Sequence, residues 1–264
     1  MGILNVTPDS FSDGGRFYAG GFNARAFLAE AEAMAAAGVQ MFDVGGESTR
    51  PGAAHVGVDE ELARVIPAVR LLKEHFSIPV SVDTSSPEVM RAACAEGADM
   101  INDVRALSRP GALDAAAQSG VPVCIMHMPA EPDVMQANPV YGDVVTEVNA
   151  FLRHRVADCI AAGIAADNIV LDPGFGFGKN LEHNLTLFRG LPSLVSEGFP
   201  VLVGVSRKRM VGEVTGREPS QRLAGSLALA LLAVQKGARI VRVHDVAQTV
   251  DALKMFYAVE DGRL

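Results

Sequence analysis

The amino-acid sequence predicts an α/β fold, a (β/α)8 TIM barrel that forms a single domain over residues 1–264. Eight short apolar runs, rich in β-branched residues, alternate with longer Ala- and Leu-rich segments whose apolar residues recur at helical spacing. Several of the helical segments end in a glycine that comes just before the next apolar run. Eight strand and helix units in about 250 residues are typical of this barrel.

The eight apolar runs are the predicted strands. They lie at residues 2–6, 41–44, 79–82, 100–101, 121–126, 169–171, 201–205 and 240–243. Their nearly continuous hydrophobicity is typical of parallel strands that are buried on both faces. An open, doubly wound sheet is the alternative, but no GxGxxG follows the first strand, and a count of eight favours the closed barrel.

The helical segments lie between these strands. Examples are residues 27–37, 60–76, 87–96, 144–162 and 223–236. The glycines that we expect to end helices in a left-handed conformation are Gly38, Gly97, Gly120, Gly163 and Gly237. Helices between successive strands would cover the outside of the barrel.

Composition excludes several classes of protein. The chain is 49% hydrophobic, and its net charge of −8 argues against the basic surface that general nucleic-acid binding requires. No apolar run reaches the roughly 20 residues of a membrane helix, and the first residues do not resemble a signal peptide. The three cysteines are far apart and favour neither a disulfide framework nor a metal site. We therefore expect a cytoplasmic protein with no nucleic-acid or membrane partner.

Polar side chains end every predicted strand. In chain order they are Asn5, Asp43 with Glu47, Asp83 with Thr84, Asn102 with Asp103, His127, Asp172, Ser206 with Lys208, and Arg242 with His244. The carboxyl ends of the strands of a (β/α)8 barrel meet at one mouth, where active sites are built. A single polar strand end is as well explained by the start of a loop, but eight in succession favour a functional site.

These side chains fall into two chemical groups. Hydrogen-bond acceptors are Asp83, Asn102 and Asp172, and donors are Arg50, Lys208, Arg242 and His244. Acceptors suit the N–H groups of an aminopyrimidinone edge, whereas the donors suit phosphate or carboxylate oxygens. The sequence therefore predicts a ligand with a donor-rich heterocycle at one end and an anion at the other.

Two loops rich in Gly, Pro, Ser and Asp follow the first two strands, with the sequences NVTPDSFSDGG and GGESTRPGA. Loops of this kind over a barrel mouth are candidates for lids that exclude water. Asn5 with Asp9 or Asp13 can hold one Mg²⁺ together with a diphosphate, because Mg²⁺ takes few protein ligands and relies on substrate oxygens. Phe11, between two serines, favours contact with a flat substrate.

Eight motifs along nearly the whole chain resemble the dihydropteroate synthase family: GILNVTPDSFSDGG, DVGGESTRPGA, SVDTS, INDV, MHM, LDPGFGFGK, GVSRK and VRVHDV. The resemblance implies an enzyme of folate synthesis that condenses 6-hydroxymethyl-7,8-dihydropterin diphosphate with p-aminobenzoate, giving 7,8-dihydropteroate and diphosphate. It also implies a Mg²⁺ cofactor and a homodimer formed through outer helices. Sulfonamide drugs, which imitate p-aminobenzoate, would be its inhibitors.

Carried onto this chain, the resemblance implies three substrate-binding groups. The pterin group is Asp83, Asn102, Met126, Asp172, Phe177, Gly204 and Lys208. The diphosphate group is Asn5, Thr49, Arg50, Arg242 and His244, with Asn5 also binding the metal. The p-aminobenzoate group is Phe11, Thr49, Pro51 and Ser206. The residues expected to act in catalysis are Asp13, Arg50, Lys208, Arg242 and His244.

The implied mechanism is SN1-like, because the C–O bond to diphosphate would break before the aniline nitrogen attacks. The pterin methylene then becomes a cation delocalised into the ring, which the carboxylates favour, while Arg, His and Mg²⁺ stabilise the leaving group. We expect no residue to act as a general base. The segment GFGFGKN lacks the spacing of a phosphate loop, and the resemblance assigns it to the wall of the pterin pocket.

Two alternative functions stay open. A methyltetrahydrofolate-binding methyltransferase domain would share a pterin barrel but has no use for a diphosphate clamp, so ESTRP, SRK and VRVHD weigh against it. A non-catalytic pterin-binding protein is disfavoured by the completeness of the motif set. Release of diphosphate that depends on p-aminobenzoate separates all three functions.

Overall fold

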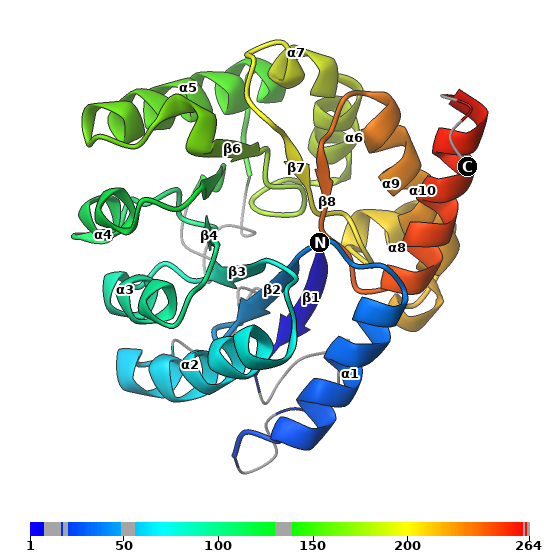
Figure 1. The fold of residues 1–264 in the computed structure, drawn as a ribbon. Helices are drawn as coiled ribbons and strands as arrows, with labels where there is room; N and C mark the ends of the chain where they lie inside the picture. The colour runs from blue at the N-terminus through cyan, green and yellow to red at the C-terminus, as the bar shows by residue number, and fades with distance from the viewer. Residues whose placement is uncertain (8–16, 18–20, 49–55, 130–138, 261, 263–264) are drawn as a thin grey trace.

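The computed structural model describes residues 1–7, 17, 21–48, 56–129, 139–260 and 262. Parallel strands alternate with outer helices along the chain (Figure 1). In order, the elements are β1 (Gly2–Asn5), α1 (Ala24–Ala36), β2 (Phe42–Gly45), α2 (Val58–His75), β3 (Val80–Asp83), α3 (Pro87–Ala95), β4 (Met100–Asp103), α4 (Ala112–Ser119), β5 (Val123–Met126), α5 (Val144–Ala161), β6 (Ile169–Asp172), α6 (Leu181–Arg189), α7 (Leu191–Val195), β7 (Leu202–Val203), α8 (Arg209–Thr215), α9 (Leu223–Gln235), β8 (Ile240–Val241) and α10 (Val246–Glu260).

The eight strands close into a barrel. Strands β1 to β6 pair in sequence order, and β7 pairs with β8. Single-residue bridges join these two sheets, between Leu171 and Val201 on one side and between Gly2 and Val243 on the other. At the second junction the amide of Ile3 donates to the carbonyl of Val243 at 3.1 Å. The predicted (β/α)8 barrel is confirmed.

Observed element boundaries differ from the predicted ones by a few residues. Strand β7, predicted at 201–205, is observed at Leu202–Val203, and β4, predicted at 100–101, is observed at Met100–Asp103. In β4 the strand is longer than predicted. Its last two residues are polar, but they stay in the strand because Asn102 faces the inside of the barrel and Asp103 bonds neighbouring polar groups on the other side. The five glycines expected after helices all have positive φ, from 69° at Gly120 to 100° at Gly237, which confirms that prediction.

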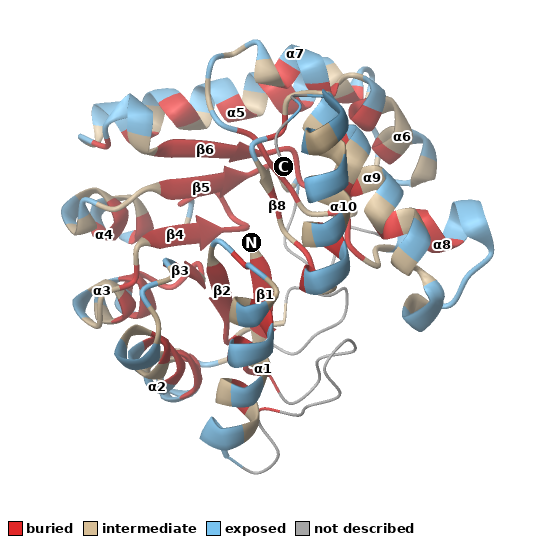
Figure 2. Ribbon diagram, turned by 45° about the vertical axis from the view of Figure 1, so that its right-hand side comes forward, coloured by how far each residue is buried: buried red, intermediate tan, exposed pale blue. Residues whose placement is uncertain are grey.

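Burial follows the two layers of the barrel (Figure 2). The main core packs the outer faces of the strands against the helices, with Phe27, Phe42 and Leu72 among its fully buried members. A smaller cluster fills the inside of the barrel and consists of Met100, Cys124, Val170 and Leu202, from the four strands β4 to β7. The barrel is therefore a packed core below its mouth, not a pore.

Two further findings concern the cysteines and the helices. All three cysteines are free thiols, and Cys124 and Cys159 are buried. No described helix is both long and apolar enough to cross a membrane.

Candidate active site

The inner faces of the strands carry the candidate site. Residues two positions apart on a strand point to the same side. The next inward positions after the buried cluster of Met100, Cys124, Val170 and Leu202 are therefore Asn102, Met126, Asp172 and Gly204. These four residues all belong to the predicted pterin group, and the structure brings them into one inward-facing layer at the carboxyl ends of the strands.

Arg242 joins two carboxylates at the centre of this layer. Its Nε donates to Oδ2 of Asp43 at 2.6 Å, and its Nη2 donates to Oδ2 of Asp83 at 2.8 Å. The side-chain amide of Asn102 donates to the other oxygen of Asp43 at 3.5 Å. Arg242, which we predicted to bind the anionic end of the ligand, and Asp83, which we predicted to bind the heterocycle, are thus in direct contact.

Burial changes how this cluster titrates. It raises the pKa of Asp83 to about 7, although the positive charge of Arg242 opposes the rise. Burial alone would lower the pKa of Arg242, but Asp43 and Asp83 together raise it above its usual range. Arg242 therefore keeps its charge at any physiological pH, while Asp83 lies close to the midpoint of its titration.

Lys208 and Asp172 form the second charged part of the mouth. The ammonium of Lys208 donates to the carbonyl oxygen of Phe175, and it lies 4.4 Å from the ring centroid of Phe177, a cation–π contact. Burial lowers the pKa of Lys208 to about 8, and the negative charge of Asp172 opposes this. Burial raises the pKa of Asp172, against the effects of Lys208 and of the Gly174 amide that donates to it at 2.7 Å.

Ser206 and His244 lie in contact at the ends of β7 and β8. The amide of His244 donates to the Ser206 hydroxyl at 3.2 Å, and its ring Nδ1 lies 3.1 Å from the same oxygen. His244 also lines a cavity of about 260 Å³ between α1 and the start of α10, whose other lining residues are Glu30, Ala33, Met34, Ala37, Arg207, Asp245, Val246, Ala247 and Gln248.

A second buried lysine, Lys179, fastens the loop after β6. Its ammonium lies 3.0 Å from Nδ1 of His127 and donates to the carbonyls of Gly174 and Phe177 at 2.9 and 3.0 Å. Burial lowers the pKa of Lys179 to about 7, and burial together with Lys179 lowers that of His127 to about 3. His127 is therefore neutral and accepts a hydrogen bond from Lys179 rather than competing with it for a proton.

Backbone approach explains the glycines of this loop. A Cβ at Gly174 would lie 2.0 Å from the carbonyl oxygen of His127, and one at Gly176 would lie 3.1 Å from Cδ of Lys208. Both glycines also have positive φ, 69° and 81°. The Gly-rich segment is required by close packing beside Lys208, in agreement with its expected place in a pocket wall.

Comparisons with known proteins show the family to which the chain belongs. Residues 1–244 match the family described as "Pterin binding enzyme". The Escherichia coli (strain K12) dihydropteroate synthase is 53% identical over 258 residues, covering 98% of this chain and 90% of that protein. The chain belongs to the dihydropteroate synthase family of pterin-binding enzymes.

Solved dihydropteroate synthases share the whole fold. The Yersinia pestis enzyme in a sulfonamide drug complex is 50% identical, with a TM-score of 0.94 over 98% of this chain and 92% of its own. The Xanthomonas albilineans enzyme was solved with 4-aminobenzoic acid, at 54% identity and a TM-score of 0.91, and with 7,8-dihydropteroate, at 52% and 0.87. Both structures cover 98% of this chain and 92% of theirs.

Behind the mouth, a polar network that sequence reasoning did not find connects β2, β3 and β4. Arg105 pairs with Glu47 at 3.1 Å and with the hydroxyl of Ser85 at 3.1 Å. Asp103 accepts from the Ser85 hydroxyl and from the amides of Arg105 and Leu107, each amide at 2.8 Å. Its members are far apart in the sequence, so local patterns do not reveal the pairing.

A carboxylate of α2 continues this network toward β3. Glu61 accepts from the hydroxyls of Thr84 and Ser86 at 2.6 and 2.7 Å. Burial raises the pKa of Glu61, and the two hydroxyls oppose the rise. The run Thr84, Ser85 and Ser86 is the one sequence signal for this region, because three adjacent hydroxyls after a buried strand need partners.

Five predicted site residues lie outside the described part of the chain: Phe11, Asp13, Thr49, Arg50 and Pro51. The same holds for Asp9. Asn5 is half-buried at the end of β1, and its side-chain oxygen lies 3.4 Å from the position that a Cβ of Gly45 would take. Among the described residues, no group of three or more His, Cys, Asp or Glu side chains is placed to hold a metal ion. An amide oxygen such as that of Asn5 fits Mg²⁺ only with further oxygens from a substrate.

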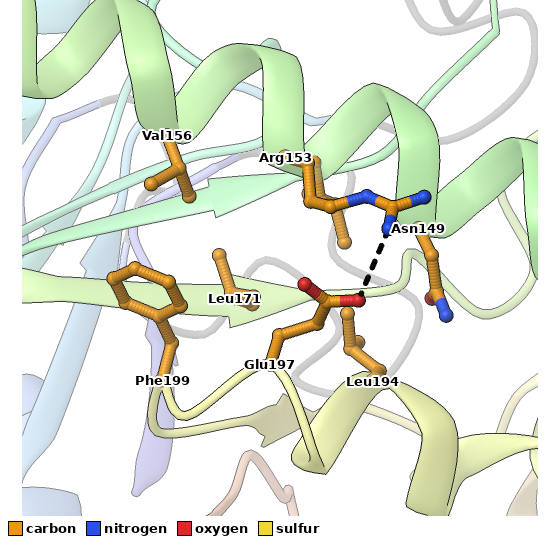
Figure 3. A pocket seen from close by; sticks show the side chains of 8 residues that line it. Asn149, Arg153, Val156, Leu171, Leu194, Glu197 and Phe199 are labelled. Atoms are coloured by element: carbon orange, nitrogen blue, oxygen red, sulfur yellow. Dashed lines mark ion pairs between the residues drawn. The ribbon is translucent and has the colours of Figure 1, made fainter.

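A separate cavity of about 50 Å³ lies outside the barrel wall, between α5, β6 and the segment after α7 (Figure 3). It is lined by Asn149, Leu152, Arg153, Val156, Leu171, Leu194, Glu197 and Phe199, and Arg153 and Glu197 pair across it at 3.6 Å. Its volume is suited to one or two water molecules and not to a heterocyclic substrate.

Proposed function

We propose that this protein condenses 6-hydroxymethyl-7,8-dihydropterin diphosphate with p-aminobenzoate to give 7,8-dihydropteroate, the product for which its family is named, and diphosphate. One observation carries the proposal: the acceptors Asp83, Asn102 and Asp172 share a single mouth with the cations Lys208 and Arg242. The relatives compared above are all named dihydropteroate synthase. A methyltetrahydrofolate-binding domain is therefore not favoured.

In this proposal the inward layer binds the pterin. Asp83, Asn102 and Asp172 accept hydrogen bonds from the N–H groups of the heterocycle, and Lys208 donates to it. Met126, Phe177 and Gly204 line the slot: Gly204 adds no side chain, and a Cβ there would lie 3.8 Å from Cβ of Arg242. The cation–π contact between Lys208 and Phe177 holds both side chains at the edge of that slot.

The diphosphate would lie on the side of Asn5, Arg242 and His244, with Thr49 and Arg50 from the second loop. Breaking the C–O bond first leaves positive charge on the pterin methylene and negative charge on the diphosphate. Arg242 and His244 stabilise the leaving oxygens, while Asp83, Asp172 and Asp13 favour the cation. Mg²⁺, held by Asn5 and the diphosphate, would add positive charge at the same oxygens. The aniline nitrogen of p-aminobenzoate then attacks without a general base.

The p-aminobenzoate subsite would combine Ser206 with Phe11, Thr49 and Pro51. The Y. pestis relative was solved with a sulfonamide drug, and the X. albilineans relative with 4-aminobenzoic acid. We therefore expect sulfonamides to inhibit this protein in competition with p-aminobenzoate.

A homodimer and a cytoplasmic location complete the proposal. Four large hydrophobic side chains are exposed on two neighbouring outer helices, Leu232 on α9 and Met255, Tyr257 and Val259 on α10. A second copy of the chain that packs on these helices would remove them from water. The three free cysteines fit a reducing compartment.

Diphosphate release measured with and without p-aminobenzoate tests the function. We expect release that depends on p-aminobenzoate, formation of 7,8-dihydropteroate in equal amount, and a strong decrease when Mg²⁺ is removed with a chelator. Tight pterin binding without diphosphate release would instead indicate a non-catalytic binding protein. Methyl transfer from methyltetrahydrofolate would support the alternative enzyme.

A further inference from the structure

Asp43 is a buried charge at the mouth to which the proposed reaction assigns no substrate. Its residue exposure is 0%, and in the β2–β3 register it pairs with Ser81, whereas Asp83 pairs with Gly45. Asp43 therefore lies one inward layer deeper than Asp83. A fully buried carboxyl group has to be compensated by hydrogen bonds or a counter-charge, and its contacts identify Arg242 as that partner.

The two carboxylates hold different atoms of the guanidinium. Asp43 accepts from Nε, the nitrogen next to the side-chain stem, at 2.6 Å, and Asp83 accepts from the terminal Nη2 at 2.8 Å. The Asp43 side chain is completely buried, while that of Asp83 keeps 12% exposure. A ligand entering from the mouth can thus reach Asp83 but not Asp43.

Nη2 contacts only Oδ2 of Asp83. A pterin edge that donates two N–H groups to this carboxylate takes both of its oxygens and so displaces Nη2. The guanidinium and the aminopyrimidinone edge both present N–H donors to a carboxylate, so they compete for the same oxygens. The contact of Asp43 with Nε remains when Nη2 leaves Asp83. The terminal nitrogens of Arg242 are then released while the stem stays in place.

We propose that Asp43 is a positioning residue that holds Arg242 at Nε, and that pterin binding to Asp83 frees the terminal nitrogens of Arg242 to bind the diphosphate. The inference rests on the proposed function, because it takes Asp83 as a pterin ligand. It adds that the heterocycle and the anion bind with positive coupling, and that this coupling works in both directions.

Separate ligands measure the coupling directly. Inorganic diphosphate is titrated calorimetrically into the protein, in one Mg²⁺-containing buffer, with and without saturating 6-hydroxymethylpterin, which carries no diphosphate. We expect the Kd of diphosphate to fall about tenfold when the pterin is present, within the usual range of coupling between two sites. An unchanged or weaker affinity would overturn the proposal.

The variant Asp83→Asn tests the competition. Loss of the Asp83 charge weakens its hold on Nη2 without any pterin, so diphosphate alone should bind more tightly than to the unmodified protein. The pterin should then add little further affinity. Weaker binding of diphosphate alone to this variant would contradict the release of Arg242 from Asp83.

The variant Asp43→Asn tests the positioning role. Its amide oxygen still accepts from Nε but carries no charge, so we expect kcat to fall about tenfold or more while the Kd of 6-hydroxymethylpterin stays within threefold. A general structural defect would weaken pterin binding as well, because Asn102 contacts the same residue. Equal losses in both measurements, or no loss in either, would refute the role. Asp43→Glu keeps the charge and should recover part of kcat.

Activity of the unmodified protein separates this inference from the proposed function. If diphosphate release depends on p-aminobenzoate but the two ligands show no coupling, the inference alone is wrong. If the protein neither binds 6-hydroxymethylpterin nor releases diphosphate, the proposed function is wrong as well.

Discussion

Two clusters of buried charge lie at the carboxyl ends of the strands, one inside the barrel mouth and one behind it. They differ in the groups that hydrogen-bond to their carboxylates. In the outer network, Asp103 accepts from two backbone amides and a serine hydroxyl, and Arg105 bonds both Glu47 and Ser85. In the mouth, Asp83 is held by Nη2 of a long side chain, Arg242. Backbone amides cannot move away from a carboxylate, whereas a guanidinium can. Asp103, held by backbone amides, therefore serves the fold, whereas Asp83, held by a movable side chain, is available to a ligand.

The outer network also holds a strained piece of backbone. Ala106 and Leu107 both have positive φ, 52° and 58°, which non-glycine residues rarely adopt. The amide of Leu107 donates to Asp103, and the carbonyl of Ala106 accepts two hydrogen bonds from Arg155 of α5, at 2.9 and 2.7 Å. Strain of this kind persists because several bonds determine the same conformation.

The largest effect is expected in the mouth, from Arg242→Ala. This change removes a donor from the leaving group, so kcat should fall by about 10²–10³-fold. Pterin affinity should change much less, because loss of the arginine frees Asp83 from a competitor but also raises its pKa. Steady-state kinetics and pterin titration measure the two effects. Arg153→Ala, on the exposed face of α5, is the matched control and should leave both values unchanged.

Unchanged turnover in Arg242→Ala would break the comparison, because it would make the mouth cluster a purely structural feature. A parallel loss of pterin affinity and turnover would mean that Arg242 acts mainly in binding the heterocycle.

The inward layer could be predicted from sequence, whereas the contacts within it could not. The two-residue period of a strand places Asn102, Met126, Asp172 and Gly204 on one side once Met100, Cys124, Val170 and Leu202 are recognised as core. The contact between Arg242 and Asp43 spans 199 positions and depends on how the last strand meets the first. No local sequence pattern indicates which residues of the first and last strands lie side by side.

Residues of the loops were harder to predict for a related reason. Lys179 follows a Gly-rich segment that lacks the spacing of a phosphate loop, but the sequence does not show which groups its ammonium contacts. Its hydrogen bonds to His127 and to the loop carbonyls show that it fastens the loop that forms the pocket wall. Arg105 and Glu47 likewise show no helical or strand periodicity, since each follows a strand end and is paired through tertiary structure.

The second expected effect is on stability, from Arg105→Met. The side chains of Arg105 and Glu47 are only 6% and 9% exposed, so removal of the cation takes a counter-charge away from a buried carboxylate. Breaking a buried pair in this way typically costs about 3–5 kcal/mol of unfolding free energy, and the lower end is expected because Ser85 remains nearby. Urea denaturation followed by circular dichroism measures it.

Arg70→Met is the matched control for that measurement. Arg70 pairs with Glu96 between α2 and α3 at 2.7 Å, but its side chain is 56% exposed. A surface pair contributes at most about 1 kcal/mol. Equal losses in the two variants would mean that burial does not distinguish the outer network from the protein surface.

The smallest expected effect is the pH dependence that Asp83 gives to stability. The pKa of this carboxyl is raised by burial from the ordinary value of 3.8 to about 7, so between these values the folded protein holds a proton that the unfolded chain has released. Raising the pH removes that proton and leaves a poorly solvated charge, so the unfolding free energy should decrease as the pH rises toward 7 and level off above it. From pH 6 to pH 8 the decrease from this group is about 1 kcal/mol.

Asp83→Asn isolates that contribution, because other buried groups, among them Lys179 and Lys208, titrate in or near the same pH range. The difference in unfolding free energy between the unmodified protein and the variant, measured in urea from pH 6 to pH 8, should shift in favour of the variant as the pH rises. Because Asp83 is in contact with Arg242, the slope of that difference reports the two side chains together. A difference that does not change with pH would mean that Arg242 compensates the buried charge fully. Asp83 would then be held as firmly as Asp103. The contrast between movable and fixed hydrogen-bond partners would not apply to it.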